Sequence, residues 1–549
     1  MKLMRFGFLL LFAIASSATL LAQAQPGESY KGLLTARVRS QTLPPSSHMK
    51  AYIQDGKLRL GLRDAILLAL ENNSQIQIEE TQIETNKFSL LAAFQPFDPL
   101  LQSSLNISRS SNPAYYQLQG VGQTGAGVLN NLNQIGQVSY TQMLTTGTNL
   151  QATIYSARNS TNSSFYFFNP NYSSYLDLNF TQPLLRNRGR FANTALIKIA
   201  RKALSQSRWS FEADVNDLIQ QVVIQYWAAV QARGALEVQN RSVDLAEVSF
   251  KRDKRALELG ALPPLDISRS ESEVAARRVG QVQAAYALQQ AEEALRLTIG
   301  ADQDAQVRAL PLELSENPEP TGELQTTQLD AALTQALSQR PEVAAAGDAL
   351  AGDELSIRLA HNQLKPDLTV NGFYQSNGLG GNQYDLTTGQ LTSPGGFGSS
   401  FGQLFGFGFP GYGGTLTLNL PVRNRAGQAR LGNALVSKTR DLYSRQQVQE
   451  FITRQVRDAI NQLDAARLSL SAANTSFDLT KKLLAADQRK FELGSEDNFF
   501  VLDSQQKLAQ AELALLQARV NYQVALTAVG HATGDLIGPY RLQIEAATK

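Results

Sequence analysis

The chain has 549 residues with 50 basic and 48 acidic side chains, and 43% of its residues are hydrophobic. The resulting net charge of +2 argues against a nucleic-acid partner. Cysteine is absent, which excludes disulfides, thiolate metal sites and cysteine nucleophiles, and the three histidines have no metal-ligand spacing. We therefore expect no catalytic residue, no metal and no cofactor.

The N-terminal stretch is typical of a secretory signal. Lys2 and Arg5 precede an apolar run over 6–21, and a small-x-small cleavage motif ends at Ala24. We expect residues 1–24 to be removed on export, with a retained membrane anchor as the alternative. No later stretch contains about 18 consecutive apolar residues, so no other transmembrane helix is expected. The mature chain is then either soluble or a β-barrel.

The first elements of the mature chain are predicted to be an arm and a helix. Residues 25–57 carry proline, serine, glutamine and scattered apolar residues, and are expected to form a loosely ordered arm. From residue 58 the apolar spacing is helical, and its pattern at 62–70 returns at 329–337, an offset of 267 (332 − 65). This return indicates an internal duplication, with repeats over 58–300 and 329–530.

After the first helix of each repeat, the apolar period changes to two. Such alternation predicts strands with one apolar face. The alternating segments are 101–107, 175–180, 368–372 and 415–420. Two further segments, 137–143 and 149–155, flank a glycine turn and predict an extra β-hairpin in the first repeat only.

Residues 374–414 separate the strands of the second repeat and are rich in Gly, Ser, Asn, Phe and Tyr. A phosphate-binding loop would need a following Lys-Ser/Thr and the start of a helix. No such dipeptide follows, and no helix is expected there. The composition therefore favours a surface loop that joins two strands.

Long proline-free spans carry apolar residues at a spacing of seven. The heptad positions are Val215, Val222, Ala229, Leu236, Val243, Phe250 and Leu257 in the first repeat, and Val456, Leu463, Leu470, Phe477, Leu484 and Phe491 in the second. This spacing favours coiled-coil packing over an ordinary bundle core. A helix from about 193 to 259 would be about 100 Å long at 1.5 Å per residue.

A Glu-Leu-Gly motif ends each heptad span, at 258–260 and at 492–494, an offset of 234 (492 − 258). Glycine ends a helix readily because it adopts positive φ. We therefore expect two helical hairpins, with tips at 259–266 and 493–503. The acidic, proline-containing segment 301–328 is expected to link the repeats, and 531–549 to form a polar tail.

In order along the chain, these features resemble the TolC-like outer membrane factor family. They include the repeated helix pattern, the strand exit Thr-Gln-Pro-Leu-Leu at 181–185, the two tips and Val-Leu-Asp-Ser-Gln at 501–505. The resemblance covers about 58–300 and 325–535. It implies an internally duplicated α+β fold, in which a trimeric outer-membrane β-barrel is continued by a long periplasmic α-helical coiled-coil barrel.

The resemblance also implies a function. The homotrimer would be the passive outer-membrane channel of a tripartite efflux or type I secretion system. It would export small molecules or proteins together with a periplasmic adaptor (membrane fusion) protein and an inner-membrane pump. The alternative is a structural periplasmic or surface coiled-coil protein, such as a trimeric adhesin or adaptor subunit. An enzyme is least consistent with the sequence.

Two groups of site residues are predicted. The adaptor-binding tips are expected at Leu259, Gly260, Leu493 and Gly494, with mere closure of the turn as the alternative role of the glycines. The pore gate is expected at Asp266, Asp503, Phe500 and Asp497. Rings of like charge would repel one another and attract cations, whereas the alternative role of Asp266 and Asp503 is helix N-capping. Phe500 stands where the family often has its first aspartate.

Overall fold

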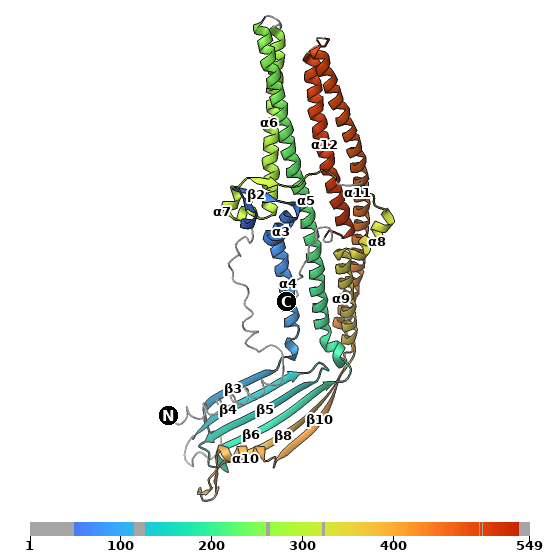
Figure 1. Ribbon diagram of the computed structural model, residues 1–549. Helices are drawn as coiled ribbons and strands as arrows, with labels where there is room; N and C mark the ends of the chain where they lie inside the picture. Colours follow the sequence, from blue (N-terminus) through green and yellow to red (C-terminus); the bar gives the residue numbers. More distant parts are fainter. Residues whose placement is uncertain are drawn as a thin grey trace.

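Two long helices run from a β-sheet at one end of the molecule to the tips of helical hairpins at the other (Figure 1). They are α5 (Gly189–Glu258, 70 residues) and α11 (Arg425–Glu492, 68 residues). The hairpins are completed by α6 (Pro264–Thr298) and α12 (Asn498–Thr533). The computed structural model describes residues 49–114, 127–259, 264–320, 324–493, 495–496 and 498–536. The signal 1–24 and the rest of the chain before residue 49 lie outside these ranges.

The heptad residues of both repeats face the helical packing, as predicted. All are buried or half-buried, and Val222, Val243, Val456 and Leu463 are fully buried. The residues after the tips that continue the pattern, such as Val274, Leu295, Leu515 and Tyr522, are buried as well. Burial along one stripe of each helix holds the two hairpins side by side, and α12 packs directly against α5.

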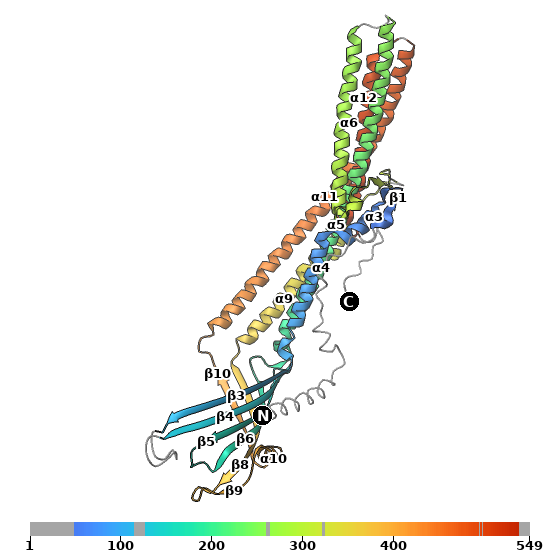
Figure 2. The same cartoon turned by 90° about the vertical axis from the view of Figure 1, so that its left-hand side faces the viewer.

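Shorter helices cover the middle and the sheet-proximal parts of the two long helices (Figure 2). They are α3 (Leu62–Asn72), α4 (Ser74–Ala92), α8 (Leu329–Gln339) and α9 (Pro341–Gln363). Helix α4 packs on α5, and α9 packs on both α5 and α11. The predicted helical start at residue 58 is wrong, because β2 (Lys57–Leu60) precedes α3.

An equatorial layer surrounds the middle of the helices. It contains η1 (Met49–Tyr52), β1 (Ile53–Gln54), β2, η4 (Ala301–Gln303), α7 (Ala305–Arg308) and β7 (Leu312–Leu314). The short η2 (Gln95–Phe97) lies elsewhere, between α4 and the sheet. Strands β2 and β7 pair in parallel. The Tyr226 hydroxyl joins this layer to α5, since it donates to the Leu60 carbonyl at 3.2 Å and accepts from the Glu316 amide at 3.3 Å. Residues 49–57 are therefore ordered elements rather than part of a loose arm.

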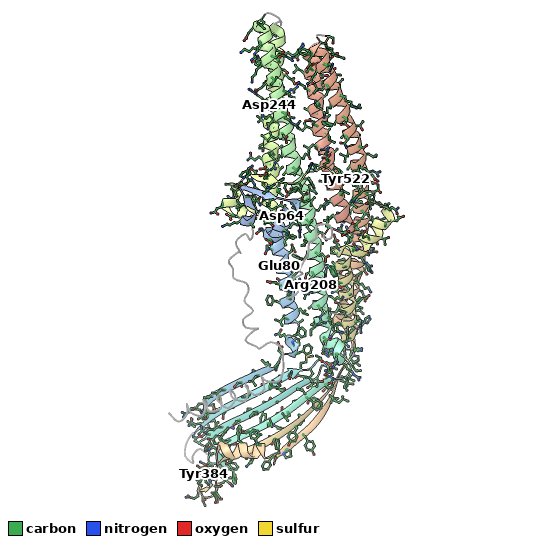
Figure 3. The ribbon with its side chains drawn as sticks, viewed as in Figure 1. Asp64, Glu80, Arg208, Asp244, Tyr384 and Tyr522 are labelled. Carbon is green, nitrogen blue, oxygen red and sulfur yellow. The ribbon has the colours of Figure 1, made fainter. Side chains whose placement is uncertain are left out.

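The sheet at the opposite end from the tips is antiparallel and has the order β10-β8-β6-β5-β4-β3. Its strands are β3 (Leu100–Pro113), β4 (Val128–Met143), β5 (Asn149–Thr161), β6 (Phe168–Pro183), β8 (Asp367–Tyr384) and β10 (Pro410–Asn419), and the short β9 (Leu391–Ser393) pairs with β8. Tyr384, at the far end of β8, marks the end of the molecule opposite the tips (Figure 3). The two repeats meet where β6 pairs with β8.

The extra hairpin of the first repeat is present as β4 and β5. Its turn is closed by a hydrogen bond from the Leu144 amide to the Thr148 carbonyl at 2.8 Å, and Gly147 adopts a φ of 91°. An alanine there would be strained because L-residues rarely adopt positive φ. The first repeat therefore contributes four strands to the sheet, and the second contributes β8 and β10 to the same path.

The two faces of the sheet differ in polarity. The strand register places Leu101, Leu105, Val138, Tyr140, Leu150, Ile154, Leu176, Leu178, Phe180, Val370, Tyr374, Leu416 and Leu418 on one side, the apolar face. It places Gln102, Ser104, Gln137, Ser139, Gln151, Thr153, Asp177, Asn179, Asn371, Gln375, Thr415 and Thr417 on the other, the polar face, which also carries Ile135, Tyr155, Tyr175 and Phe373.

The expectation of a surface loop over 374–414 is wrong. Strand β8 continues to Tyr384, and α10 (Phe397–Phe405) forms between β9 and β10. The helix exists because the sheet buries Ser400 and Leu404 completely, and such packing outweighs the low helix propensity of its glycines. None of the helices in the described ranges has the length and apolar character needed to cross a bilayer.

Candidate functional site

Each helical hairpin ends on an exposed leucine. Leu259 is 84% exposed and Leu493 is 76% exposed. Their amides close the last helical turns by donating to the Arg255 and Arg489 carbonyls, both at 3.1 Å. The two tips therefore present equivalent apolar side chains to solvent. Gly260 and Gly494, the other predicted tip residues, lie outside the described residues.

The turn after α11 is held by its own hydrogen bonds. The amide and hydroxyl of Ser495 both donate to the Lys490 carbonyl at 2.9 Å. The Lys490 ammonium lies 3.0 Å from the Glu496 carboxylate, whose hydrogen bond and charge raise the pKa of Lys490. These contacts fix the start of the turn that carries Leu493.

The predicted gate residues lie in the first turns of α6 and α12. Phe500 is half-exposed and stacks edge-on with Phe499 at a centroid distance of 5.5 Å. Asp503 forms an ion pair with Lys507 at 2.7 Å. Because α12 begins at Asn498, Asp503 is not an N-cap, and that alternative is wrong for this residue. Asp266 belongs to the first turn of α6, but its side chain, like all of Asp497, lies outside the description.

Sequence reasoning missed a buried polar pair in each hairpin. The Ser270 hydroxyl donates to Asp253 at 2.5 Å, and the Ser504 hydroxyl donates to Asp487. The aspartates are only 6% and 7% exposed. Both residues of the pair recur at an offset of 234 (487 − 253 and 504 − 270), the offset of the tips. The recurrence of the two serines was the signal that could have revealed the pairs.

A second set of contacts ties the two tips to each other. The Asn498 side-chain amide donates to Asp253 at 3.0 Å and accepts from Arg252. The Arg252 guanidinium lies 4.6 Å from the ring centroid of Phe491, on the other hairpin. Ala486 stands at the position matching Arg252, so the internal repeat alone could not have revealed this contact.

Further along the hairpins, a buried arginine makes another cross-link. The Arg277 guanidinium donates to the Ser242 hydroxyl at 3.0 Å and to the Leu502 carbonyl at 3.4 Å. Arg277 thus joins α5, α6 and α12 within a few turns of the tips. The two hairpins of one chain form a single unit at the end that carries Leu259 and Leu493.

The sequence and the fold were compared with those of known proteins. The family described as "Outer membrane efflux protein" matches residues 130–301 and 332–535. The fold is similar to that of the CmeC outer membrane channel of Campylobacter jejuni, with 15% identity, coverage of 93% of each chain and a TM-score of 0.61. It is also similar to the open state of the MtrE outer membrane channel of Neisseria gonorrhoeae, with 17% identity, coverage of 86% of this chain and 88% of that one, and a TM-score of 0.57.

A membrane protein from Pseudomonas aeruginosa has the same fold, with 18% identity, coverage of 93% of this chain and 100% of that chain, and a TM-score of 0.60. A search of curated protein sequences found no match. The family match spans both repeats and confirms the predicted resemblance to TolC-like outer membrane factors. This chain belongs to the outer membrane efflux protein family.

Proposed function

We propose that three copies of this chain form the outer-membrane channel of a tripartite efflux system, with a long periplasmic extension. The family is one of outer membrane efflux channels, and a structural adhesin or adaptor subunit is not favoured. The observation that supports the trimer is the open sheet. Within the described residues, β3 and β10 each pair on one side only. An exposed strand edge offers unpaired backbone groups, which barrels satisfy by closure.

A shared barrel would use the two faces of the sheet. Three sheets of six strands would supply eighteen strands (3 × 6). A barrel of about 16–18 strands encloses an aqueous channel. The polar face, with its Gln, Asn, Ser and Thr side chains, would line that channel, and the apolar face would contact lipid. A passive duct needs no catalytic group.

The helical hairpins would continue the duct into the periplasm. Three chains would bring six hairpins, two per chain, around one axis, with Leu259 and Leu493 facing a periplasmic adaptor protein as apolar contacts. Gly260 and Gly494 would shape the same tips. The adaptor would connect the channel to an inner-membrane pump.

The gate would lie where the first turns of α6 and α12 approach the axis. Asp503 and Asp266 would form acidic rings, to which Asp497 could contribute a further charge. Phe500 would supply an apolar constriction next to them. These assignments rest on the position of the residues just past the tips.

The first test is the mass of the detergent-solubilised particle together with its behaviour in planar bilayers. We expect a particle of three chains that forms water-filled channels. A monomer, or a particle that stays in solution without detergent, would exclude the proposal. Extraction with outer membranes and heat-modifiable migration on gels would separate the channel from a periplasmic coiled-coil protein.

A further inference from the structure

Helix α10 lies against β8 and β6, near the end of the sheet that is far from the hairpins (Figure 2). Hydrogen bonds attach it to the apolar face, to which Ser376 belongs because it pairs with Leu176. The Ser376 hydroxyl donates to the Leu404 carbonyl at 2.7 Å, and the Ser400 hydroxyl donates to the Gly378 carbonyl at 3.1 Å. The helix therefore covers the side of the sheet that the proposed barrel turns toward lipid.

Glycines in β8 allow α10 to pack closely against the sheet. A Cβ atom on Gly378 would lie 2.0 Å from the Ser400 carbonyl oxygen, and one on Gly380 would lie 2.4 Å from the Gly396 carbonyl oxygen. Only glycine permits so close an approach of helix and strand backbones. The Gln403 side chain also accepts from the Leu379 amide at 2.9 Å. Helix α10 is thus a seated element of the fold.

Phenylalanine side chains lie along α10 beside its buried residues, Ser400 and Leu404. Phe397 and Phe401 have ring centroids 4.2 Å apart, and Phe401 and Phe405 have centroids 6.0 Å apart. Phe405 is 55% exposed, and Phe407 and Phe409 beyond it are exposed as well. No charged residue lies between Asp385 and Arg423. Exposed aromatic rings in a segment of the chain without charged residues are more favourable in apolar surroundings than in water.

The level of the helix along the strands matches a membrane boundary. Ser376 is the tenth residue of β8, counted from Asp367 (376 − 367 + 1). A strand crosses the bilayer core in about 9–11 residues, so the contact lies where a crossing from the periplasmic end is completed. On the apolar face beyond that level the character turns polar. The Arg158 guanidinium there donates to the Tyr172 hydroxyl at 3.1 Å and to the Gln134 side chain at 2.9 Å.

We propose that α10 is an interfacial membrane anchor, which inserts Phe401 and Phe405 among the acyl chains of the outer leaflet. The inference rests on the proposed function, because it requires the sheet to span the outer membrane. Aromatic side chains are favoured at this depth because their rings tolerate both the apolar core and the headgroup region. The anchor would hold each subunit of the barrel at one height in the membrane.

The absence of cysteine permits a direct test, since each introduced cysteine is a unique labelling site. The variants Phe405→Cys, Phe409→Cys, Leu178→Cys and Leu391→Cys would each be spin-labelled in the assembled channel in lipid vesicles. Leu178, on the apolar face of β6, reports the lipid-facing sheet, and the exposed Leu391 of β9 reports the distal end. The ratio of collision with oxygen, which partitions into lipid, to collision with a water-soluble nickel chelate measures the depth.

We expect the ratio at 405 to be several-fold higher than at 391 and similar to that at 178. The label at 409 gives a second reading if the variant at 405 fails to assemble. Labels at 405 and 409 that are as accessible to the nickel chelate as the label at 391, while 178 remains in lipid, would overturn the anchor and leave the channel intact. A label at 178 that is also in water would overturn the membrane-spanning sheet, and the anchor with it.

Discussion

The hydroxyl of Ser270 donates to the buried carboxylate of Asp253 at 2.5 Å, across the two helices of the first hairpin. The same relationship joins Ser504 to Asp487 in the second hairpin, 234 residues later. A buried carboxylate is costly unless hydrogen bonds satisfy it, so each pair fixes the register of its two helices below the tip. Both repeats therefore contain this buried Ser–Asp hydrogen bond, although the surroundings of the two aspartates differ.

The two serines are predicted to differ in their contribution to stability. Asp253 also accepts hydrogen bonds from Asn498 and Arg252, whereas the ion pair that Asp487 makes among the described residues is with Lys490, at 4.0 Å. Ser504→Ala should therefore destabilise its hairpin by about 1–3 kcal/mol, and Ser270→Ala by less. Hydrogen exchange of the amides in the last turns of α11 and α5 measures both effects. The exposed Ser268 provides the control Ser268→Ala, and equal effects at 270 and 504 would contradict the prediction.

The gate prediction can be tested at both residues of the ion pair between Asp503 and Lys507. If Asp503 belongs to an acidic ring, Asp503→Asn should raise single-channel conductance and weaken block by divalent cations added on the periplasmic side. Lys507→Gln removes the partner cation, so it should strengthen that block. Planar-bilayer recordings check both variants, together with Asp266→Asn. Unchanged conductance and block in all three would remove these aspartates from the gate and leave Phe500→Ala as the next variant to record.

The tips are predicted to bind the adaptor through their exposed leucines. Leu493→Asp should leave trimer assembly intact and abolish export, since a charge replaces an apolar contact at the docking surface. Leu259→Asp should act in the same direction. Substrate accumulation in cells and cross-linking to the adaptor are the measurements, with Glu492→Gln as the control at a neighbouring exposed side chain. Loss of assembly in the leucine variants would instead show that the tips are structural.

A pH effect is expected near the middle of α5. Burial, followed by the charges of Glu79, Asp217 and Glu342, raises the pKa of Asp214 from 3.8 to about 6. The folded state therefore binds this proton more tightly than the unfolded chain, and stability falls as pH rises through that window. Asp214→Asn removes the titrating carboxyl group, so the variant should not lose this stability as the pH rises.

The variant should thus be more stable than the parent at about pH 7.5, by about 1 kcal/mol after allowance for solvent screening, and equal to it near pH 4. Thermal unfolding of the helical signal at the two pH values measures the difference. The exposed Asp478 of α11 provides the control Asp478→Asn, which should show no such pH dependence. A stability gain of the same size at both pH values would show that the titration of Asp214 does not cause the pH dependence.

Local periodicity was sufficient to predict the long helices, their heptad faces, the two tips and the extra hairpin. Each of these depends on residues that are neighbours along the chain, because a helix repeats every 3.6 residues and a strand every two. The exposed positions of Leu259 and Leu493 followed from the same reasoning, since a tight turn at the end of a helix has little to pack against. The gate roles of Asp266, Asp497, Phe500 and Asp503 and the adaptor-binding roles of Leu259, Gly260, Leu493 and Gly494 all remain predictions.

The tertiary structure alone decided which distant segments meet. The pairing of β6 with β8, which makes one sheet from two repeats, and of β2 with β7 depends on strand edges that any strand could in principle use. Ser270 and Asn498, which donate hydrogen bonds to Asp253 of α5, lie on α6 and α12. Helix α10 is the clearest case: its glycines and phenylalanines carry no helical preference, and it forms because a glycine-lined sheet buries Ser400 and Leu404 beneath it.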